Sequence, residues 1–524
     1  MRASTPLLLL LMFFVGSETV RAAERKPNVI LVLADDLGAR ELGCYGNTLH
    51  KTPNLDRLAA EGTRFETFYV NPLCTPTRVA LMTGQYGFHN GFLGMSNPAF
   101  VPGKSSPRRD IATHFTHGRM LQQAGYVTAL AGKWQLSGKL PDLVFEAGFE
   151  HYRMWAYDHN LPEEVKHPAH ESGGNACRYW HPSILENGKY LPTRPEQYGP
   201  DLFNEFVLDF VRSHKSQPFF VYYPSVLTHS PHLETPDPGK PGERRAATFK
   251  NNLEYLDHLM GRLLDTLKAE ELDRNTVVIF IGDNGTGGAG KATLTELGAR
   301  TPCIVRGPGV RSGVVSRAVA DVTDIFPTLA DLAGVQLPGD RPFDGHSLLP
   351  VLRGEKERHR DWIYSHLDDG RVLRDNRWLL EIDKGGGREK FFDCGESRDG
   401  SGYKEVSRSA DPEVREARAR FGRILEGLPN VLPGRVEGAP QAEGATRKAP
   451  EATGGEDARF KRRDLDADGR ISREEFLSTL QGNNREAGMK RFEAMDANRD
   501  GFVSREEFAA FLKSEGRKPA EVQK

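Results

Sequence analysis

Residues 24–350 alternate short, nearly continuous apolar runs with longer segments of helical periodicity. Apolar runs of this kind are typical of strands that are buried on both faces, as in a parallel sheet covered by helices. Their β-branched and aromatic content favours strands over short buried helices. The pattern predicts an α/β domain with a large, mostly parallel central sheet flanked by helices. The clearest runs are NVILVLA (28–34), YVTALA (126–131), PFFVYYPSV (218–226) and TVVIFI (276–281).

Residues 351–430 are more charged, and their apolar segments are shorter. The segments DWIYSHL, RWLLEI and EKFFDC resemble short antiparallel strands, and PEVREARARFGRILEGL has helical periodicity. We therefore expect a small α+β subdomain after the main domain. Residues 431–456 are rich in Gly, Pro, Ala and Glu and have almost no apolar periodicity, which is typical of a flexible linker.

Beyond the linker, a similar segment occurs twice, beginning at Arg459 and again at Arg491. Each copy contains the pattern D-x-[DN]-x-D-G-x5-E, which is typical of the calcium-binding loop of an EF hand. Two matches in tandem favour an α-helical EF-hand pair over residues 457–515, with two bound Ca²⁺ ions, over the alternative of a solvated acidic tail. We expect Ile471 and Val503 to pair between the loops. The expected oxygen ligands are Asp464, Asp466, Asp468, the Arg470 carbonyl and Glu475 in the first loop, and Asp496, Asn498, Asp500, the Phe502 carbonyl and Glu507 in the second.

The N-terminus has the pattern of a secretory signal peptide over residues 1–23. Arg2 gives it a basic start, LLLLLMFFV is its apolar core, and small residues allow cleavage after Ala22 or Ala23. The apolar run is too short to span a bilayer comfortably, and no later run is long and apolar enough to be a transmembrane helix. The sequence thus predicts an exported protein, periplasmic or extracellular, without a transmembrane anchor.

The composition allows a large core and gives no sign of a nucleic acid partner. The 524 residues are 38% hydrophobic. The formal net charge is −2, so the chain has no excess of positive charge that would attract nucleic acid. The chain has five cysteines, so at least one has no partner within the chain, and Cys74 is our candidate. The pairing of the other four and the oligomeric state stay open.

Unusual polar residues follow each of the four apolar runs. They are Asp35 and Asp36 after the first, Lys133 and Gln135 after the second, His229 after the third, and Asp283, Asn284 and Lys291 after the fourth. In open α/β sheets, ligands bind outside the carboxyl ends of the strands, so parallel strands would bring these groups to one edge. The carboxylates and the amide oxygen suit Ca²⁺ or Mg²⁺, and the lysines with Arg78 suit a tetrahedral oxyanion. A cation site with a positive rim predicts hydrolysis of an anionic ester.

Cys74 lies just before the helical pattern RVALMTGQY, and a helix N-terminus favours negative charge. The segment CTPTR, residues 74–78, matches the C-x-P-x-R signature of the type I sulfatases, which belong to the alkaline-phosphatase-like superfamily. The segments ADDLG, GKW, THSP, GDNG and GKATLTELGARTPCIVRGPG match the other sulfatase blocks in order. The chain therefore resembles this family over residues 26–350, more loosely to residue 430, and not in the linker or the EF-hand pair.

The resemblance implies a secreted sulfatase that acts on sulfate esters, with sulfated carbohydrates as the expected substrates. In this family a maturation system oxidises the motif cysteine to formylglycine. One hydroxyl of the hydrated aldehyde attacks sulfur, and the other later expels sulfate. The resemblance assigns one Ca²⁺ ion to Asp35, Asp36, the modified Cys74, Asp283 and Asn284. It further implies that Arg78 orients the nucleophile, Lys133 and Lys291 hold sulfate oxygens, His229 protonates the leaving oxygen, and Asp283 can take the nucleophile's proton.

One position departs from the family pattern, because Gln135 stands where the block G-K-W-H-L-G has histidine. Glutamine can donate a hydrogen bond but cannot carry charge or transfer a proton. A weaker enzyme, a different substrate class and an inactive relative are all open, and the intact remaining positions favour an active variant.

Two other functions are weighed against the sulfatase. A phosphomonoesterase or phosphodiesterase on the same fold is disfavoured by Cys74, because such relatives usually use Ser or Thr as nucleophile. A catalytically impaired, calcium-dependent binding protein is favoured by Gln135 alone. Residues 170–182 mix histidines and aromatics, and they line a substrate pocket or form an ordinary insertion loop.

Overall fold

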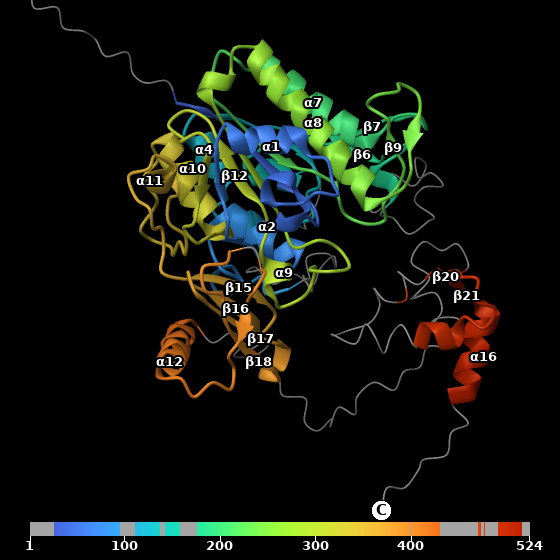
Figure 1. The fold of residues 1–524 in the computed structure, drawn as a ribbon. Helices are drawn as coiled ribbons and strands as arrows, with labels where there is room; N and C mark the ends of the chain where they lie inside the picture. Colours follow the sequence, from blue (N-terminus) through green and yellow to red (C-terminus); the bar gives the residue numbers. More distant parts are fainter. Residues whose placement is uncertain are drawn as a thin grey trace, which may run out of the picture.

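The computed structural model describes residues 26–94, 111–136, 142–157, 176–398, 400–429, 470–472, 476 and 491–515. Its largest element is a ten-stranded sheet with the order β13-β2-β12-β11-β1-β8-β4-β5-β6-β7 (Figure 1). The strands are β1 (Asn28–Ala34), β2 (Thr63–Phe65), β4 (Val127–Gly132), β5 (His151–Trp155), β6 (Ile184–Glu186), β7 (Lys189–Leu191), β8 (Phe219–Pro224), β11 (Thr276–Gly282), β12 (Cys303–Arg306) and β13 (Val314–Ser316).

The four apolar runs form the middle of this sheet. Strand β1 pairs in parallel with β11 on one side and with β8 on the other, and β8 pairs in parallel with β4. Antiparallel pairs occur toward the edges, where β12 joins β11 and β6 joins β5. The expected large, mostly parallel sheet is therefore confirmed.

Helices cover both faces of the sheet because each central strand is apolar on both sides. Along β1, residues Val29, Leu31 and Leu33 pack into one hydrophobic cluster, and the alternate residues pack into another. The first cluster includes side chains of α2 (Cys74–Thr83), α4 (His117–Gln123), α5 (Asp142–Glu146), α10 (Ile325–Ala333) and α11 (Leu349–Leu352). The second includes α1 (Pro53–Ala60), α7 (Gly199–Ser213) and α8 (Phe249–Ala269), of which α7 and α8 lie side by side (Figure 1).

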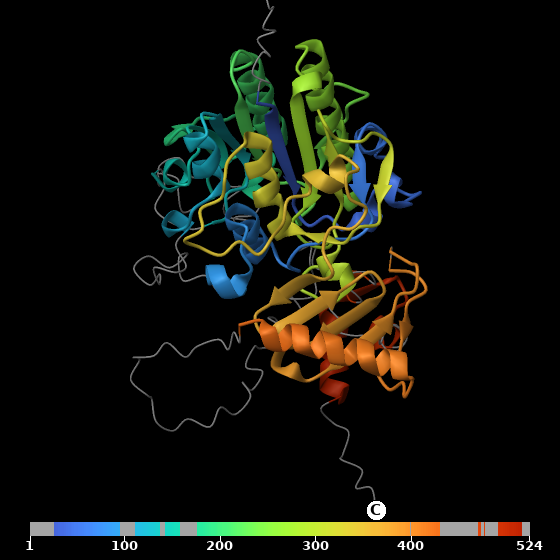
Figure 2. The ribbon, with the colours of Figure 1, turned by 90° about the vertical axis from the view of Figure 1, so that its left-hand side faces the viewer.

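A five-stranded antiparallel sheet follows the main domain, with α12 (Pro412–Gly427) lying across it (Figure 2). Its strands are β15 (Ile363–Leu367), β16 (Gly370–Arg374), β17 (Trp378–Ile382), β18 (Glu389–Asp393) and β19 (Lys404–Glu405). Asp411 caps α12 by accepting a hydrogen bond from the Glu413 N–H, and Pro412 occupies the first turn. Val414, Ala417 and Phe421 share one helix face and are buried against this sheet, as expected of an α+β subdomain.

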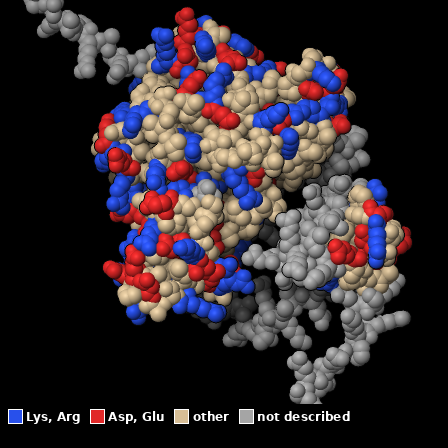
Figure 3. All heavy atoms as spheres, in the orientation of Figure 1, with Lys and Arg blue, Asp and Glu red and all other residues tan. Residues whose placement is uncertain are grey.

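Short elements connect these layers. They are β3 (Phe68–Tyr69) with β14 (Ala320–Asp321), β9 (Thr235–Pro236) with β10 (Arg244–Arg245), α3 (Gly87–Asn90) and α9 (Glu296–Ala299). No helix in the described ranges is long and apolar enough to cross a membrane. The five cysteines all lie in those ranges, and no disulfide joins them. On the face drawn in Figure 3, acidic and basic side chains are interspersed, in keeping with the net charge of −2.

The described part of the tail has an EF-hand pairing. Strand β20 (Arg470–Ser472) runs antiparallel to β21 (Phe502–Ser504), and Ile471 lies opposite Val503, as the sequence indicates. Helix α16 (Arg505–Glu515) follows. A small core contains Ile471, Phe476, Phe492, Met495, Val503 and Phe508. The expected signal peptide, the linker and the first-loop carboxylates Asp464, Asp466, Asp468 and Glu475 lie outside the described residues.

Candidate active site

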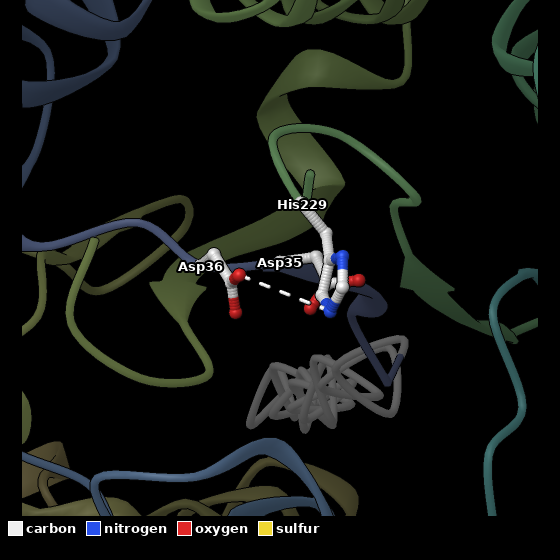
Figure 4. Close-up of side chains that lie close together, drawn as sticks. All are labelled: Asp35, Asp36 and His229. Carbon is white, nitrogen blue, oxygen red and sulfur yellow. Dashed lines mark ion pairs between the residues drawn. The ribbon is translucent and has the colours of Figure 1, made fainter. Parts of the chain in front are cut away.

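The central strands deliver their polar residues to one edge of the sheet. The register places Ala34 beside Gly282 and Leu33 beside Pro224, so the segments that follow these strands leave the sheet together. The Asp36 N–H donates to Asp283 Oδ1 at 2.9 Å. Figure 4 shows His229 with its ring turned toward Asp36, and its Nε2 lies 3.9 Å from Asp36 Oδ2. Groups that are far apart in the sequence therefore form one site.

A glycine allows the chain to leave β4 close to its neighbour. Gly132 has a φ of 114°, and a Cβ at this position would lie 2.1 Å from the Pro224 carbonyl oxygen. Glycine adopts this conformation readily and has no side chain to clash. The following residue, Lys133, then points its ammonium group at Asp35 Oδ2, at 2.7 Å.

Cys74 is the first residue of α2 and is only 1% exposed. Gln135 Nε2 donates a hydrogen bond to Cys74 Sγ at 3.1 Å. Arg78 lies one turn later on α2 and is fully buried. Its Nη2 is 2.7 Å from Asp283 Oδ2 and 3.6 Å from Asp35 Oδ1, so the helix places thiol and guanidinium in the same site.

The charges of the site balance, with three cationic side chains facing three carboxylates. Lys291 Nζ lies 2.8 Å from Asp36 Oδ1 and completes the set begun by Arg78 and Lys133. Burial alone would raise the pKa of Asp35, but attraction from Lys133, His229 and Arg78 outweighs burial and holds that pKa well below its usual range. Burial, helped by the negative charge of Asp35, raises the pKa of Asp283 to about 7.

The oxygen atoms of the site fit a hard cation. Within the described residues, Asp35 Oδ1 and Asn284 Oδ1 are buried without a hydrogen-bond partner, and buried polar atoms normally have one. In the described part of the chain, Asp35, Asp36 and His229 have metal-ligating atoms that lie within 4.8 Å of one another. Carboxylate and amide oxygens suit Ca²⁺ better than an imidazole nitrogen does, so the two aspartates and Asn284 are the better candidates. The Asp283 oxygens accept from Arg78 and from the Asp36 N–H.

The segment that begins at residue 176 holds the loop of His229. Tyr179 Oη donates to the His229 carbonyl oxygen at 2.8 Å, and Arg178 Nη2 donates to the same oxygen at 2.8 Å. Burial lowers the pKa of His229 to about 4. The sequence did not single out Arg178, because a lone arginine among histidines and aromatics has no pattern of its own. Its only signal was the unusual composition of residues 170–182.

The second EF-hand loop has the conformation of a calcium loop. Asp496 accepts hydrogen bonds from the Asp500 and Gly501 N–H groups at 3.1 and 3.0 Å. Glu507, the last expected ligand, accepts from the Ser504 N–H at 2.9 Å and from the Asn498 N–H at 3.1 Å. Gly501 has a φ of 88°, the left-handed conformation that the sharp turn of the loop requires. The carboxylates therefore lie at the inner side of the loop.

A cation site of carboxylates beside lysine and arginine side chains, outside the strands of an α/β sheet, is typical of a hydrolase that cleaves anionic esters. Residues 27–335 match the sulfatase family, and residues 456–480 and 489–512 match the EF hand. The chain therefore belongs to the sulfatase family and is a sulfuric ester hydrolase with a C-terminal EF-hand pair.

Similar proteins include animal sulfatases and a solved structure with a bound oligosaccharide. N-acetylgalactosamine-6-sulfatase of Canis lupus familiaris is 31% identical over 393 residues, which cover 69% of this chain and 73% of that protein. Arylsulfatase A of Bos taurus is 33% identical over 407 residues, which cover 71% and 76%. The structure of Ps i-CgsB in complex with k-i-k-neocarrahexaose has a TM-score of 0.62 and 26% identity, and the match covers 76% of this chain and 93% of that one.

Proposed function

We propose that the chain is exported and hydrolyses sulfate esters of carbohydrates, with formylglycine formed from Cys74 as nucleophile and Ca²⁺ bound at Asp35, Asp36, Asp283 and Asn284. The observation that carries this proposal is the position of Cys74, at the start of α2 and in contact with Gln135 inside the charged site. Formylglycine supplies two hydroxyls when hydrated, one to attack sulfur and one to release sulfate. Ca²⁺ supplies positive charge for the sulfate oxygens and the nucleophile.

The cationic side chains bind and orient. Lys133 and Lys291 each hold an aspartate of the site at 2.7 to 2.8 Å, and both can turn a donor toward a sulfate oxygen. Arg78 is buried and fixed by Asp283, so it holds the nucleophile rather than the substrate. Asp283 contacts Arg78 and lies in the same site as Cys74, so it is the proposed acceptor of the nucleophile's proton.

His229 is the general acid in this proposal. Its Nε2 faces Asp36, where the ester would bind, and its Nδ1 faces Arg178. Burial lowers its pKa to about 4 without substrate, and the negative charge of a bound sulfate ester raises that pKa toward the value an acid needs. Gln135 cannot take over this role, because an amide does not transfer protons.

The comparisons support the carbohydrate substrate class, and the sequence supports the compartment. One relative is named for a sulfated amino sugar, and a structural neighbour was solved with neocarrahexaose. The leader-like segment at residues 1–23 supports export, to the periplasm or beyond.

Sulfate release from a panel of sulfated glycans, run beside the matching phosphate esters, tests the proposal. We expect release from at least one sulfated glycan by protein matured in its native host, and much slower release of phosphate. Faster hydrolysis of phosphate esters would favour a phosphatase on this fold. Calcium-dependent glycan binding without turnover would favour an impaired binding protein.

A further inference from the structure

Arg178 is a buried arginine outside the set of residues that the family pattern assigns. It ends the short helical turn Ala176–Arg178 and is only 1% exposed. Its guanidinium lies over the rings of Trp155 and Tyr179, with its central carbon 5.2 and 4.9 Å from the ring centres. Such stacking fixes the plane of a guanidinium and compensates part of the cost of burying its charge.

The guanidinium binds two backbone carbonyl groups of the loop that carries His229. Arg178 Nη2 donates to the His229 carbonyl oxygen at 2.8 Å and to the Ser230 carbonyl oxygen at 2.7 Å. The same nitrogen lies 3.2 Å from His229 Nδ1, and Nδ1 also contacts the Ser230 carbonyl oxygen. A guanidinium only donates hydrogen bonds and keeps its charge. One side of the imidazole is thus occupied, and its other nitrogen, Nε2, faces Asp36 at 3.9 Å.

Direct binding of substrate by Arg178 fits these contacts less well. Both hydrogens of Nη2 are used by the two carbonyl oxygens, and its Nε is buried without a hydrogen-bond partner in the described part of the chain. A substrate could reach Nε only if the surrounding side chains moved. The contacts of Nη2 and the burial of Nε therefore favour an action of the arginine through His229.

We propose that Arg178 is a positioning residue that holds His229 so that Nε2 delivers its proton to the leaving oxygen. As the S–O bond of the ester breaks, its electron pair stays on that oxygen, which takes the proton from Nε2. The inference rests on the proposed role of His229 as general acid. Misplacement of a catalytic group by about 1 Å can cost on the order of a hundredfold in rate, so an arginine that contacts the general acid can control the step.

Leaving-group dependence distinguishes this role from a purely structural one. A phenolic sulfate leaves without much help from an acid, whereas a sugar sulfate needs the proton. We expect Arg178→Ala to lower kcat for a sugar sulfate by roughly ten- to a hundredfold and for a phenolic sulfate by less than about threefold. Because both rates are measured on one preparation, their ratio does not depend on the folded fraction.

Three further measurements sharpen the test. Arg178→Lys should also lower kcat more for the sugar sulfate than for the phenolic sulfate, because an ammonium group lacks the planar set of donors of a guanidinium. Adding guanidinium to Arg178→Ala should restore part of the sugar-sulfate rate. Adding Arg178→Ala to His229→Ala should cost little more than His229→Ala alone, since both changes remove one step. Arg244→Ala is the matched control, because Arg244 stacks on Trp180 at 3.7 Å and contacts neither His229 nor Ser230 in the described structure.

The outcomes separate the inference from the proposed function. Three results would overturn the role of Arg178 while leaving a working sulfatase. They are an equal loss of kcat on both substrates, additive losses of kcat in the double variant, and a change in KM alone. Absence of sulfate release by the matured wild-type enzyme from either substrate would overturn both proposals.

Discussion

Gln135 is the position that departs from the family pattern described above, and it contacts Cys74, the proposed nucleophile. Its amide donates to Cys74 Sγ at 3.1 Å, and its φ of 52° turns the side chain into the site. A neutral amide provides the same donor at every pH. The contact therefore favours an active variant over a relative that has lost its chemistry.

Loss of this amide should slow turnover modestly. We expect Gln135→Ala to lower kcat on a phenolic sulfate by up to roughly tenfold, because a hydrogen bond of this type contributes about 1 kcal/mol. Steady-state kinetics at saturating substrate measure the effect. Gln85→Ala is a matched control, since Gln85 bonds the Pro342 carbonyl oxygen outside the site. Unchanged kcat for Gln135→Ala would show that the contact has no catalytic role.

Replacement of Cys74 tests the nucleophile itself. Cys74→Ser should preserve the fold and abolish repeated turnover, because serine lacks the second hydroxyl that expels sulfate. Protein from the native host should yield a residue-74 peptide that is lighter than its thiol form and reacts with hydrazide. Mass spectrometry measures both. An unmodified Cys74 in an enzyme that still turns over sulfate esters would contradict the mechanism.

At the residue scale, the sequence predicts those site residues that lie in a recognisable local motif. Asp35, Asp36 and Asp283 each follow a strand directly, so the strand pattern alone brings them together. Arg178 could not be predicted, because its contacts depend on how the loop after β8 folds back onto a segment some fifty residues earlier.

Among the elements, the pairing of β20 with β21 links the two calcium loops. Val503 is fully buried opposite Ile471, in a core of only a few side chains. Calcium binding and packing should therefore depend on each other.

We expect Val503→Ala to destabilise the EF-hand pair by about 2 kcal/mol, because a small core cannot refill the lost volume. Calcium titration of the full chain should show weaker binding at both loops. Val315→Ala, at a position that is 45% exposed on β13, is the matched control with little effect. Weaker binding at one loop only would argue against coupling through the strand pair.

The central strands were predictable as elements because a strand that is buried on both faces has a nearly continuous run of apolar residues in its sequence. The short strands β2, β12 and β13 were not, since each has only three or four residues and forms by pairing with distant segments. Short strands of this kind depend on long-range partners more than on their own sequence.

At the scale of the whole molecule, the proposed calcium site of the active site and the EF-hand pair lie in separate parts of the sequence. We expect a chain that ends at residue 430 to release sulfate at close to the full rate, because the active-site residues lie between Asp35 and Lys291. Removal of calcium by a chelator should stop both the full and the shortened enzyme. Loss of all turnover in a folded, shortened enzyme would show that the tail takes part in catalysis.

The burial of Cys74 sets an order of events during biosynthesis. An enzyme that oxidises a thiol must touch it, and in the folded chain Cys74 is 1% exposed and its Sγ is in contact with Gln135. If Cys74 is converted to formylglycine as proposed, its oxidation therefore has to come before the domain folds, while residues 74–78 are still accessible. A host that folds the chain faster than it modifies Cys74 would produce two populations with the same fold and different activity. The unmodified population should stay inactive when mixed with the maturation system, and should gain activity only after it has been unfolded, treated and refolded.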